Sequence, residues 1–158
     1  RGIVGVQLPE GGEAATRERM LHRFPTAAES APPIELQRVL DDIVGLLKGE
    51  ARDLSTIALD MEGVPPFHRR VYDVARTIPA GRTLSYGDIA ARVGAGKAAR
   101  AVGQALGRNP FPIIVPCHRV VAAGGKLGGF SARGGVSTKQ RLLDIERANV
   151  SWQLPLQV

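Results

Sequence analysis

The chain has 158 residues, of which 44% are hydrophobic, and a formal net charge of +6 at pH 7. This length allows one sizeable hydrophobic core or two small ones, and no apolar run approaches the about 20 residues that a membrane-spanning helix needs. A single cysteine excludes an intramolecular disulfide and a cysteine-based zinc site. Because the chain also lacks an export signal, we expect a cytoplasmic protein whose start, which is not a methionine, has been processed or trimmed.

The charge is unevenly distributed along the chain. Residues 1–66 carry seven Lys and Arg against eleven Asp and Glu, a net charge of −4, whereas residues 67–158 carry fourteen against four, a net charge of +10. One interpretation is a solvated surface that happens to be uneven, and the other is that the basic half binds a polyanion. Nucleic acid is favoured over a membrane, because no basic amphipathic helix with a bulky apolar face accompanies the charge.

The acidic half has the pattern of a small α/β domain, residues 1–62. Runs of apolar residues predict strands, and apolar residues at helical spacing after Pro33 predict a helix. In chain order we expect a strand, two helices and a strand, at residues 3–8, 14–24, 33–47 and 54–59. Residues 63–66, which contain Gly and Pro, then form a linker.

The basic half, residues 67–158, predicts a mostly helical domain. Ser85 is a good N-cap, and Asp88 stands where a capping box places its acid. Helices are expected at residues 67–78, 86–93, 97–107 and about 137–148, with a strand from 109 to 116 and a Gly-rich loop at 124–135. The two short central helices, separated by a glycine turn, form a helix-turn-helix pattern, although many plain helical hairpins look the same.

The helix expected at 97–107 has two different faces. Its inner face is apolar and consists of Ala98, Val102, Ala105 and Leu106. Its outer face combines a small residue with cations and one glutamine: Lys97, Arg100, Ala101, Gln104 and Arg108. A face without bulk approaches a narrow surface closely, and this one has few long side chains that could read base edges. The pattern predicts minor-groove contact with little sequence discrimination, against the alternative of an ordinary surface helix.

Cys117 is followed at once by His118. A lone thiol is either an inert buried side chain or a nucleophile, and for an arbitrary cysteine the first is commoner. A nucleophilic thiol needs a cation or base beside it, and a histidine base needs a group that orients its ring. His118 reaches Cys117 directly only if the chain turns there, and otherwise through a water. Asp144 and Glu146 are the candidate acids, although spacing alone does not bring these groups together.

Residues 116–120, Pro-Cys-His-Arg-Val, resemble the active-site motif of the O6-alkylguanine-DNA alkyltransferases (methylated-DNA–protein-cysteine methyltransferases), and the resemblance is to the bacterial type. It extends strongly over residues 66–158 and only loosely over 1–65. Further matches stand at the family's spacing: Tyr86, Arg100, Asn109, the loop at 129–131 and the helix that contains Lys139 and Glu146. The resemblance implies DNA repair by irreversible transfer of an alkyl group from O6-alkylguanine to the protein's own cysteine, after the base has been flipped out of the duplex.

The resemblance also implies a catalytic role for five residues. Cys117 would attack the alkyl carbon and keep the alkyl group. His118 would act as base, through a water, and Glu146 would hold His118. Tyr86 would donate a hydrogen bond to the departing guanine, and Asn109 would tie the recognition helix to the segment that carries the cysteine.

DNA contacts and a base pocket follow from the same resemblance. Arg100 would enter the stack in place of the extruded nucleotide. Four neighbours on the helix would make further DNA contacts: Ala99, Ala101, Gln104 and Arg108. The guanine pocket would be lined by the backbones of Cys117 and Val120, together with Ser131 and Phe130.

The fold and partners implied are those of the family. A small ribonuclease H-like α/β domain would precede a mostly helical domain that contains a helix-turn-helix. The partner would be double-stranded DNA carrying O6-alkylguanine, with no membrane contact and no cofactor, and the protein would be a monomer, with cooperative assembly on DNA left open. Some relatives hold zinc in the first domain, but no cysteine precedes Cys117 here, so no metal is expected.

Departures from the family pattern affect the pocket. Phe130 stands where some relatives carry Tyr, and the loop at 132–135 is longer than in the human-type enzyme. Two other functions stay open. A DNA-binding damage sensor would lack transferase chemistry, although a non-catalytic branch of the family has Trp in place of the cysteine. A cysteine hydrolase would use Cys117, His118 and Glu146, but no acyl-binding signature accompanies them.

Overall fold

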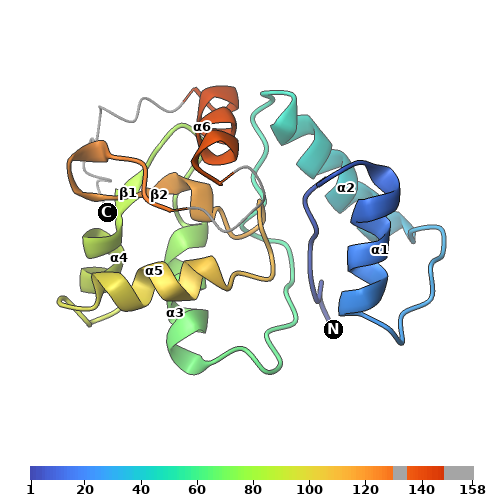
Figure 1. Ribbon diagram of the computed structural model, residues 1–158, viewed down its shortest axis with the longest axis horizontal. Coiled ribbons are helices and arrows are strands. Elements are labelled where there is room, and N and C mark those ends of the chain that lie inside the picture. Colours follow the sequence, from blue (N-terminus) through green and yellow to red (C-terminus); the bar gives the residue numbers. More distant parts are fainter. Residues whose placement is uncertain (130–134, 148–158) are drawn as a thin grey trace.

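The computed structural model describes residues 1–129 and 135–147, in which the helices form two groups joined by extended chain (Figure 1). Helices α1 and α2 lie on one side together with residues 1–8, and α3, α4, α5 and α6 lie on the other. Within this part of the chain the sheet has two strands, β1 and β2, both in the second group. The fold is therefore mixed, with helices predominating over a very small sheet.

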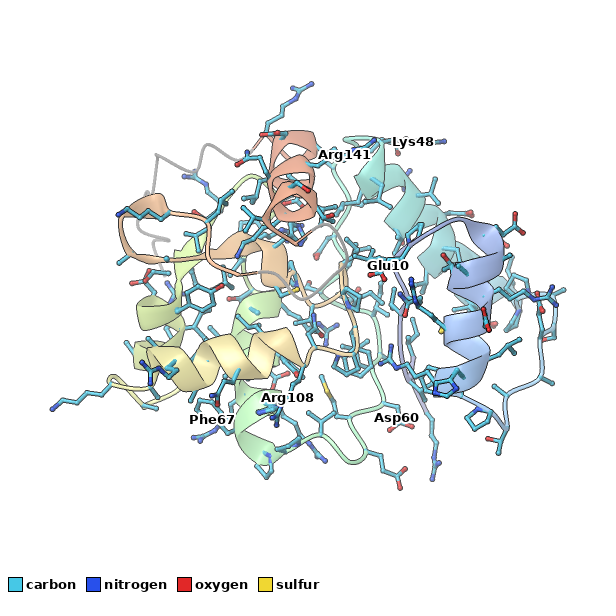
Figure 2. All side chains as sticks on the ribbon, in the orientation of Figure 1. Glu10, Lys48, Asp60, Phe67, Arg108 and Arg141 are labelled. Atoms are coloured by element: carbon cyan, nitrogen blue, oxygen red, sulfur yellow. The ribbon has the colours of Figure 1, made fainter. Side chains whose placement is uncertain are left out.

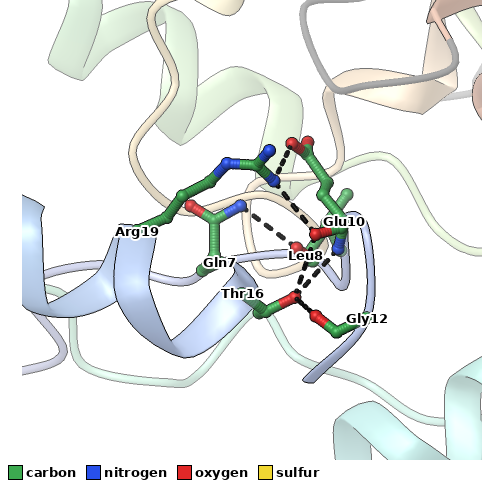
Figure 3. A network of polar contacts seen from close by, with 6 residues as sticks. All are labelled: Gln7, Leu8, Glu10, Gly12, Thr16 and Arg19. Carbon is green, nitrogen blue, oxygen red and sulfur yellow. Dashed lines mark hydrogen bonds and ion pairs between the residues drawn. The ribbon is translucent and has the colours of Figure 1, made fainter. Parts of the chain in front are cut away.

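At the start of helix α1, Glu13–Arg23, side chains of the helix contact the turn that precedes it (Figure 3). Thr16 Oγ1 donates to the Gly12 carbonyl at 2.8 Å and accepts from the Glu10 N–H at 3.0 Å. Arg19 adds an ion pair with the Glu10 carboxylate at 2.7 Å. These contacts fold the turn that follows the first extended run back onto the helix.

Helix α2, Ile34–Leu47, begins directly after Pro33, as predicted. Gly45 and Leu46 are its buried residues. Large apolar side chains along much of its length are exposed: Ile34, Leu36, Leu40 and Val44. Residues 13–23 of α1 include no buried side chain at all. The helices of the acidic half thus form where expected, but many of their apolar side chains stay exposed to solvent.

The two strands predicted in the acidic half are wrong in extent. They reduce to one isolated parallel bridge between Ile3 and Leu59. Residues 54–57 close a turn instead, in which the Ile57 N–H donates to the Leu54 carbonyl. Val6 donates its N–H to the Pro110 carbonyl, so the end of the first run pairs with the basic half and not with a strand of its own domain. The apolar residues that predicted strands here instead contact residues of the basic half.

Helices α3 (Pro66–Arg76), α4 (Tyr86–Arg92) and α5 (Ala99–Gly107) surround the main core. The capping box predicted at Ser85 is present: its hydroxyl accepts from the Asp88 N–H at 3.0 Å, and its own N–H donates to the Asp88 carboxylate at 2.8 Å. Helices α1 to α5 begin and end within two residues of the predicted bounds. The core contains fully or almost fully buried apolar side chains: Val71, Tyr72, Ile78, Ile89, Val102, Phe111 and Val115.

Two very short strands were not predicted. Strand β1, Leu84–Ser85, runs parallel to β2, Val120–Val121, with Leu84 opposite Val120. A 3₁₀ turn, Cys117–Arg119, precedes β2, and a second one, Ala123–Gly125, follows it. Helix α6, Gly135–Ile145, ends the described chain. The sheet joins the entrance to α4 with the segment that carries the cysteine.

The strand predicted for residues 109–116 is wrong. Pro110, Pro112 and Pro116 lack the N–H groups that a sheet ladder needs. Ile113 has a φ of 73°, which reverses the chain direction, and the Val115 N–H donates back to the Phe111 carbonyl at 2.8 Å. The apolar run is buried, as its composition suggests, but as a compact turn.

A second, smaller cluster connects the two halves. Leu46 and Leu54 of the acidic half pack with Ile113 and with Leu142 of α6. Helix α6 is therefore supported from the acidic side of the molecule. No helix within the described ranges is long and apolar enough to cross a membrane.

Candidate active site

Cys117 begins the 3₁₀ turn that leads into β2. The Cys117 N–H donates to the Val115 carbonyl at 2.8 Å, and the Arg119 N–H donates to the Pro116 carbonyl at 2.9 Å. Asn109, which follows α5, donates from its side-chain amide to the same Val115 carbonyl at 2.9 Å. Asn109 thereby links the end of α5 to the cysteine turn.

The Cys117 side chain lies at the edge of the core. The residue is 8% exposed, and burial raises the pKa of its thiol. A hydrogen bond from Asn109, the charge of Lys139, and the backbone N–H groups of Cys117 and His118 act in the opposite direction and favour the thiolate. The resting side chain is a thiol, surrounded by groups that stabilise the anion when a base removes the proton.

His118 is fully buried and pairs with Glu146. Its Nε2 lies 2.9 Å from Glu146 Oε1, across 28 residues of sequence. Because a carboxylate only accepts, Nε2 carries the proton and Nδ1 is left as an acceptor. Among the residues described, Nδ1 has no hydrogen-bond partner. Burial lowers the pKa of His118 despite the opposing effect of Glu146, so the imidazole is neutral at pH 7.

Glu146, just beyond α6, receives three hydrogen bonds on its two oxygens. Besides His118, Arg119 donates from Nε to Oε2 at 3.0 Å and from Nη2 to Oε1 at 2.8 Å. Burial alone would raise the pKa of Glu146, but the hydrogen bonds and charges of His118 and Arg119 bring it to about 2. The other candidate acid, Asp144, instead accepts from Gln140 at 2.7 Å.

Tyr86 and Lys139 form a second pair beside the cysteine. Lys139 is fully buried on α6, and its Nζ donates to the Val120 carbonyl and, at 3.4 Å, to the Tyr86 hydroxyl. Burial lowers the pKa of Lys139 to about 8, so it is still a cation at pH 7. Since an ammonium only donates, the hydroxyl proton of Tyr86 is available to a different acceptor. Gly128 packs against this hydroxyl, and a Cβ added there would lie 2.6 Å from its oxygen.

A cavity of about 790 Å³ opens between α4, α5 and the cysteine turn. Cys117 and Tyr86 line it together with Arg100 and Gln104 of α5. Small residues make up most of the remaining wall: Gly87, Ala99, Gly103, Gly107, Ala122, Ala123 and Gly129. One face of α5 therefore lines the same cavity as the Cys117 and Tyr86 side chains.

The two faces predicted for α5 are confirmed. Val102, Ala105 and Leu106 are buried, whereas the long polar side chains of the other face are exposed: Lys97, Arg100, Gln104 and Arg108. Arg108 lies at the surface where α5 ends (Figure 2).

Residues 66–148 match the family model described as the DNA-binding domain of 6-O-methylguanine DNA methyltransferase. Over 125 residues the chain is 42% identical to a methylated-DNA–protein-cysteine methyltransferase of Methanothermobacter thermautotrophicus, which covers 79% of this chain and 69% of that protein. The chain belongs to the methylated-DNA–protein-cysteine methyltransferase family.

Solved structures of this family are similar over most of the chain. The O6-methylguanine methyltransferase of Mycobacterium tuberculosis has a TM-score of 0.70 and 37% identity, covering 91% of this chain and 79% of that one. A structure of the Mycobacterium tuberculosis protein in complex with DNA has a TM-score of 0.63 and 46% identity, covering 69% of this chain and 65% of that one. The bacterial character of the resemblance is confirmed by such mycobacterial relatives.

Of the pocket residues Val120, Phe130 and Ser131 predicted for this methyltransferase chain, the structure describes only Val120. Val120 is fully buried in β2 and is absent from the cavity wall described above. Phe130, Ser131 and the loop at 132–134 lie outside the described residues. Their part in a base pocket stays a prediction. Within residues 1–129 and 135–147, no three His, Cys, Asp or Glu side chains gather as a metal site would require.

Sequence reasoning missed two charged residues of the site. Lys139 and Arg119 are both buried, although basic residues are ordinarily exposed, and the sequence analysis assigned a role to neither of them. A weak signal existed for Arg119, because it lies two residues from the cysteine. Lys139 gives no comparable local signal.

Proposed function

We propose that this protein repairs DNA by transferring an alkyl group from O6 of guanine to Cys117, irreversibly and once per molecule. The observation that carries the proposal is that Cys117 lines a cavity walled by α5 and is followed in the chain by His118, which is buried and paired with Glu146. Family membership supports it, and so does the similar Mycobacterium tuberculosis structure in complex with DNA.

Proton removal from the thiol comes first. Neutral His118 offers Nδ1, its free acceptor, and takes the proton of Cys117 through a bridging water. Glu146 stabilises the imidazolium that forms, because its carboxylate already accepts from Nε2. Lys139 and Asn109 stabilise the thiolate over the same step.

Alkyl transfer follows as a displacement at carbon. The bond from Cys117 Sγ to the alkyl carbon forms while the bond from that carbon to O6 breaks, and the electron pair stays with guanine. Tyr86 donates its hydroxyl proton in a hydrogen bond to the ring as negative charge develops there, and Lys139 holds the hydroxyl in that orientation. The thiol proton finally balances the charge of the released guanine. The product is a thioether, which water does not hydrolyse, so each molecule acts once.

The DNA side of the proposal rests on α4 and α5. We infer that they form a helix-turn-helix whose second helix lies in the minor groove. The small residues of its cavity wall leave room for the backbone to approach the duplex, and Arg100 replaces the extruded nucleotide in the stack. Ala99, Ala101, Gln104 and Arg108 make the surrounding contacts. A helix that contacts few base edges suits the repair of a lesion that can form at any guanine.

We also infer how the chain divides into domains. Residues 1–62 form a ribonuclease H-like domain, which the Ile3–Leu59 bridge flanked by α1 and α2 supports. Residues 63–66 are the linker, and 67–158 bind DNA and accept the alkyl group. Val120, Phe130 and Ser131 contribute to the guanine pocket.

The decisive experiment uses duplex DNA with a radiolabelled methyl group on O6 of one guanine. We expect one label per protein molecule, bound to Cys117, and none with Cys117→Ser. Release of label as methanol, or more than one transfer per molecule, would contradict the proposal. A damage sensor would bind the duplex and take no label, and a cysteine hydrolase would turn over an acyl ester and ignore the DNA.

A second experiment tests base flipping by Arg100. Arg100→Ala should slow transfer from the duplex at least tenfold more than transfer from free O6-methylguanine, because the free base needs no extrusion. Arg92→Ala is the matched control, since Arg92 is an exposed cation at the end of α4 and outside the cavity wall. Equal losses on both substrates would show that Arg100 does not act in flipping.

A further inference from the structure

Arg119 makes three side-chain hydrogen bonds, although it is not part of the wall of the 790 Å³ cavity. Its Nε and Nη2 atoms form a fork on the two oxygens of Glu146, and its Nη1 donates to the Ile78 carbonyl. The side chains of Arg119 and Glu146 are 8% and 2% exposed. A two-point contact of this kind fixes the plane of the carboxylate as well as its position.

The position of Glu146 explains why such a clamp is needed. Helix α6 ends at Ile145, and Arg147 has a φ of 56°, so Glu146 lies where the helix gives way to a turn. One backbone hydrogen bond, from its N–H to the Leu142 carbonyl at 3.1 Å, holds it to the helix. The side chain therefore depends on its partners for its orientation.

We propose that Arg119 is a positioning residue for alkyl transfer, which clamps Glu146 toward His118 and keeps His118 free to accept the proton of Cys117. Oε1 of Glu146 is shared, because it accepts from His118 Nε2 at 2.9 Å and from Arg119 Nη2 at 2.8 Å. The two hydrogen bonds from Arg119 therefore determine the direction in which Oε1 faces His118.

The charges around His118 give Arg119 a second effect. Glu146, beyond α6, favours the imidazolium, whereas Arg119 on the same turn and Lys139 on α6 disfavour it. Cys117 precedes His118 on the same turn. Without Arg119, the negative charge of Glu146 would act on His118 with less opposition. The pKa of His118 would then rise, and more of the protein would carry an imidazolium that cannot accept a proton.

The test is the pH dependence of single-turnover methyl transfer from an O6-methylguanine duplex, between pH 5 and pH 9. We expect Arg119→Met to move the acid limb of the rate profile upward by about one pH unit or more. Because a shift of one unit lowers the fraction of neutral imidazole by at most about tenfold, the loss should approach that factor at the acid end of the range and be smaller at pH 8.5. Arg119→Lys keeps the charge without the fork, so its acid limb should stay near that of the wild type while its maximal rate falls.

Arg76→Met is the matched control. Arg76 is also partly buried, and its Nη2 donates to the Ser55 and Ile57 carbonyls rather than to Glu146. Its substitution should leave the acid limb in place. Each rate is referred to the amount of label taken up at completion, so that unfolded protein does not enter the comparison, and Arg119→Lys provides the readout if Arg119→Met does not fold.

The inference depends on the proposed function, and the outcomes separate the two. If the wild type takes no label, the proposed function fails. If the wild type reacts and Arg119→Met loses rate equally at every pH, Arg119 is merely structural and the inference is overturned. An equal shift in Arg76→Met would overturn it as well.

Discussion

The two halves of the molecule differ in how completely they bury their apolar side chains. Helices α3, α4 and α5 each place two or three residues in the core, whereas α1 places none there. Most of the large apolar side chains that stay exposed belong to residues 1–44: Val4, Leu21, Ile34, Leu36, Leu40 and Val44.

This difference coincides with the position of the chemistry. Cys117, His118 and Glu146 all lie in the tightly packed half, where rigid neighbours can hold donors and acceptors at fixed distances. The looser half reaches the site through a few contacts, such as Leu46 and Leu54 against Leu142. Close packing is thus concentrated where the proposed proton transfer takes place.

The largest effect is expected when one histidine of each half is replaced. His118→Gln should slow methyl transfer about 10²- to 10⁴-fold, because the base is lost. His22→Gln, on the exposed side of α1, should leave the single-turnover rate unchanged. A measurable slowing by His22→Gln would break the comparison, since it would extend the catalytic requirement into the looser half.

Packing itself is tested by one deletion in each half. Ile89→Ala removes a fully buried side chain from the main core and should lower the free energy of unfolding by about 2–5 kcal/mol. Leu40→Ala, at a position that is 42% exposed, should change it by about 0.5 kcal/mol or less. Urea unfolding measures both. Similar losses would mean that α2 is covered in solution.

A finer contrast lies within the packed half. A methyl group at Gly128 would press on the Tyr86 hydroxyl, so Gly128→Ala should slow transfer about tenfold or more through misplacement of the donor. Gly96→Ala meets no described atom within 4 Å, lies outside the cavity wall and serves as the control. If both variants react at the wild-type rate, the position of the Tyr86 hydroxyl is not critical.

The smallest effect concerns buried and exposed lysines. Lys139 has a folded pKa of about 8, below its ordinary value of 10.5, so the unfolded chain holds that proton to higher pH. Stability contributed by this group therefore rises with pH. Between pH 7 and pH 9 the wild type should gain about 1 kcal/mol relative to Lys139→Met. Lys48→Met, at an exposed lysine (Figure 2), should show no such difference in thermal unfolding.

The sequence predicted the helices well because their signals are local. The capping box at Ser85 and the two faces of α5 depend on residues within one or two turns of each other. The strand predictions failed for the opposite reason. A strand needs a partner, and residues 3–8 and 54–59 find one only at Ile3 and Leu59. Strand β1 consists of two residues, too few to give a periodic pattern.

The site could be predicted only in part. The motif indicated Cys117 and His118, and the resemblance suggested Glu146, but the 2.9 Å contact between His118 and Glu146 depends on how α6 packs. The burial of Lys139 depends on the same packing. Spacing along the chain carries no information on the distance between residues from separate elements, so these contacts required the folded structure.

The burial of Cys117 has a consequence for a reagent that can be spent only once. With its pKa raised and 8% of the residue exposed, the resting thiol contains little of the thiolate that oxidants and small electrophiles attack. Reactivity appears when a base within the fold removes the proton in the presence of a docked alkyl carbon. Burial thus lowers the chance that a small molecule consumes the thiol before an alkylated base reaches it.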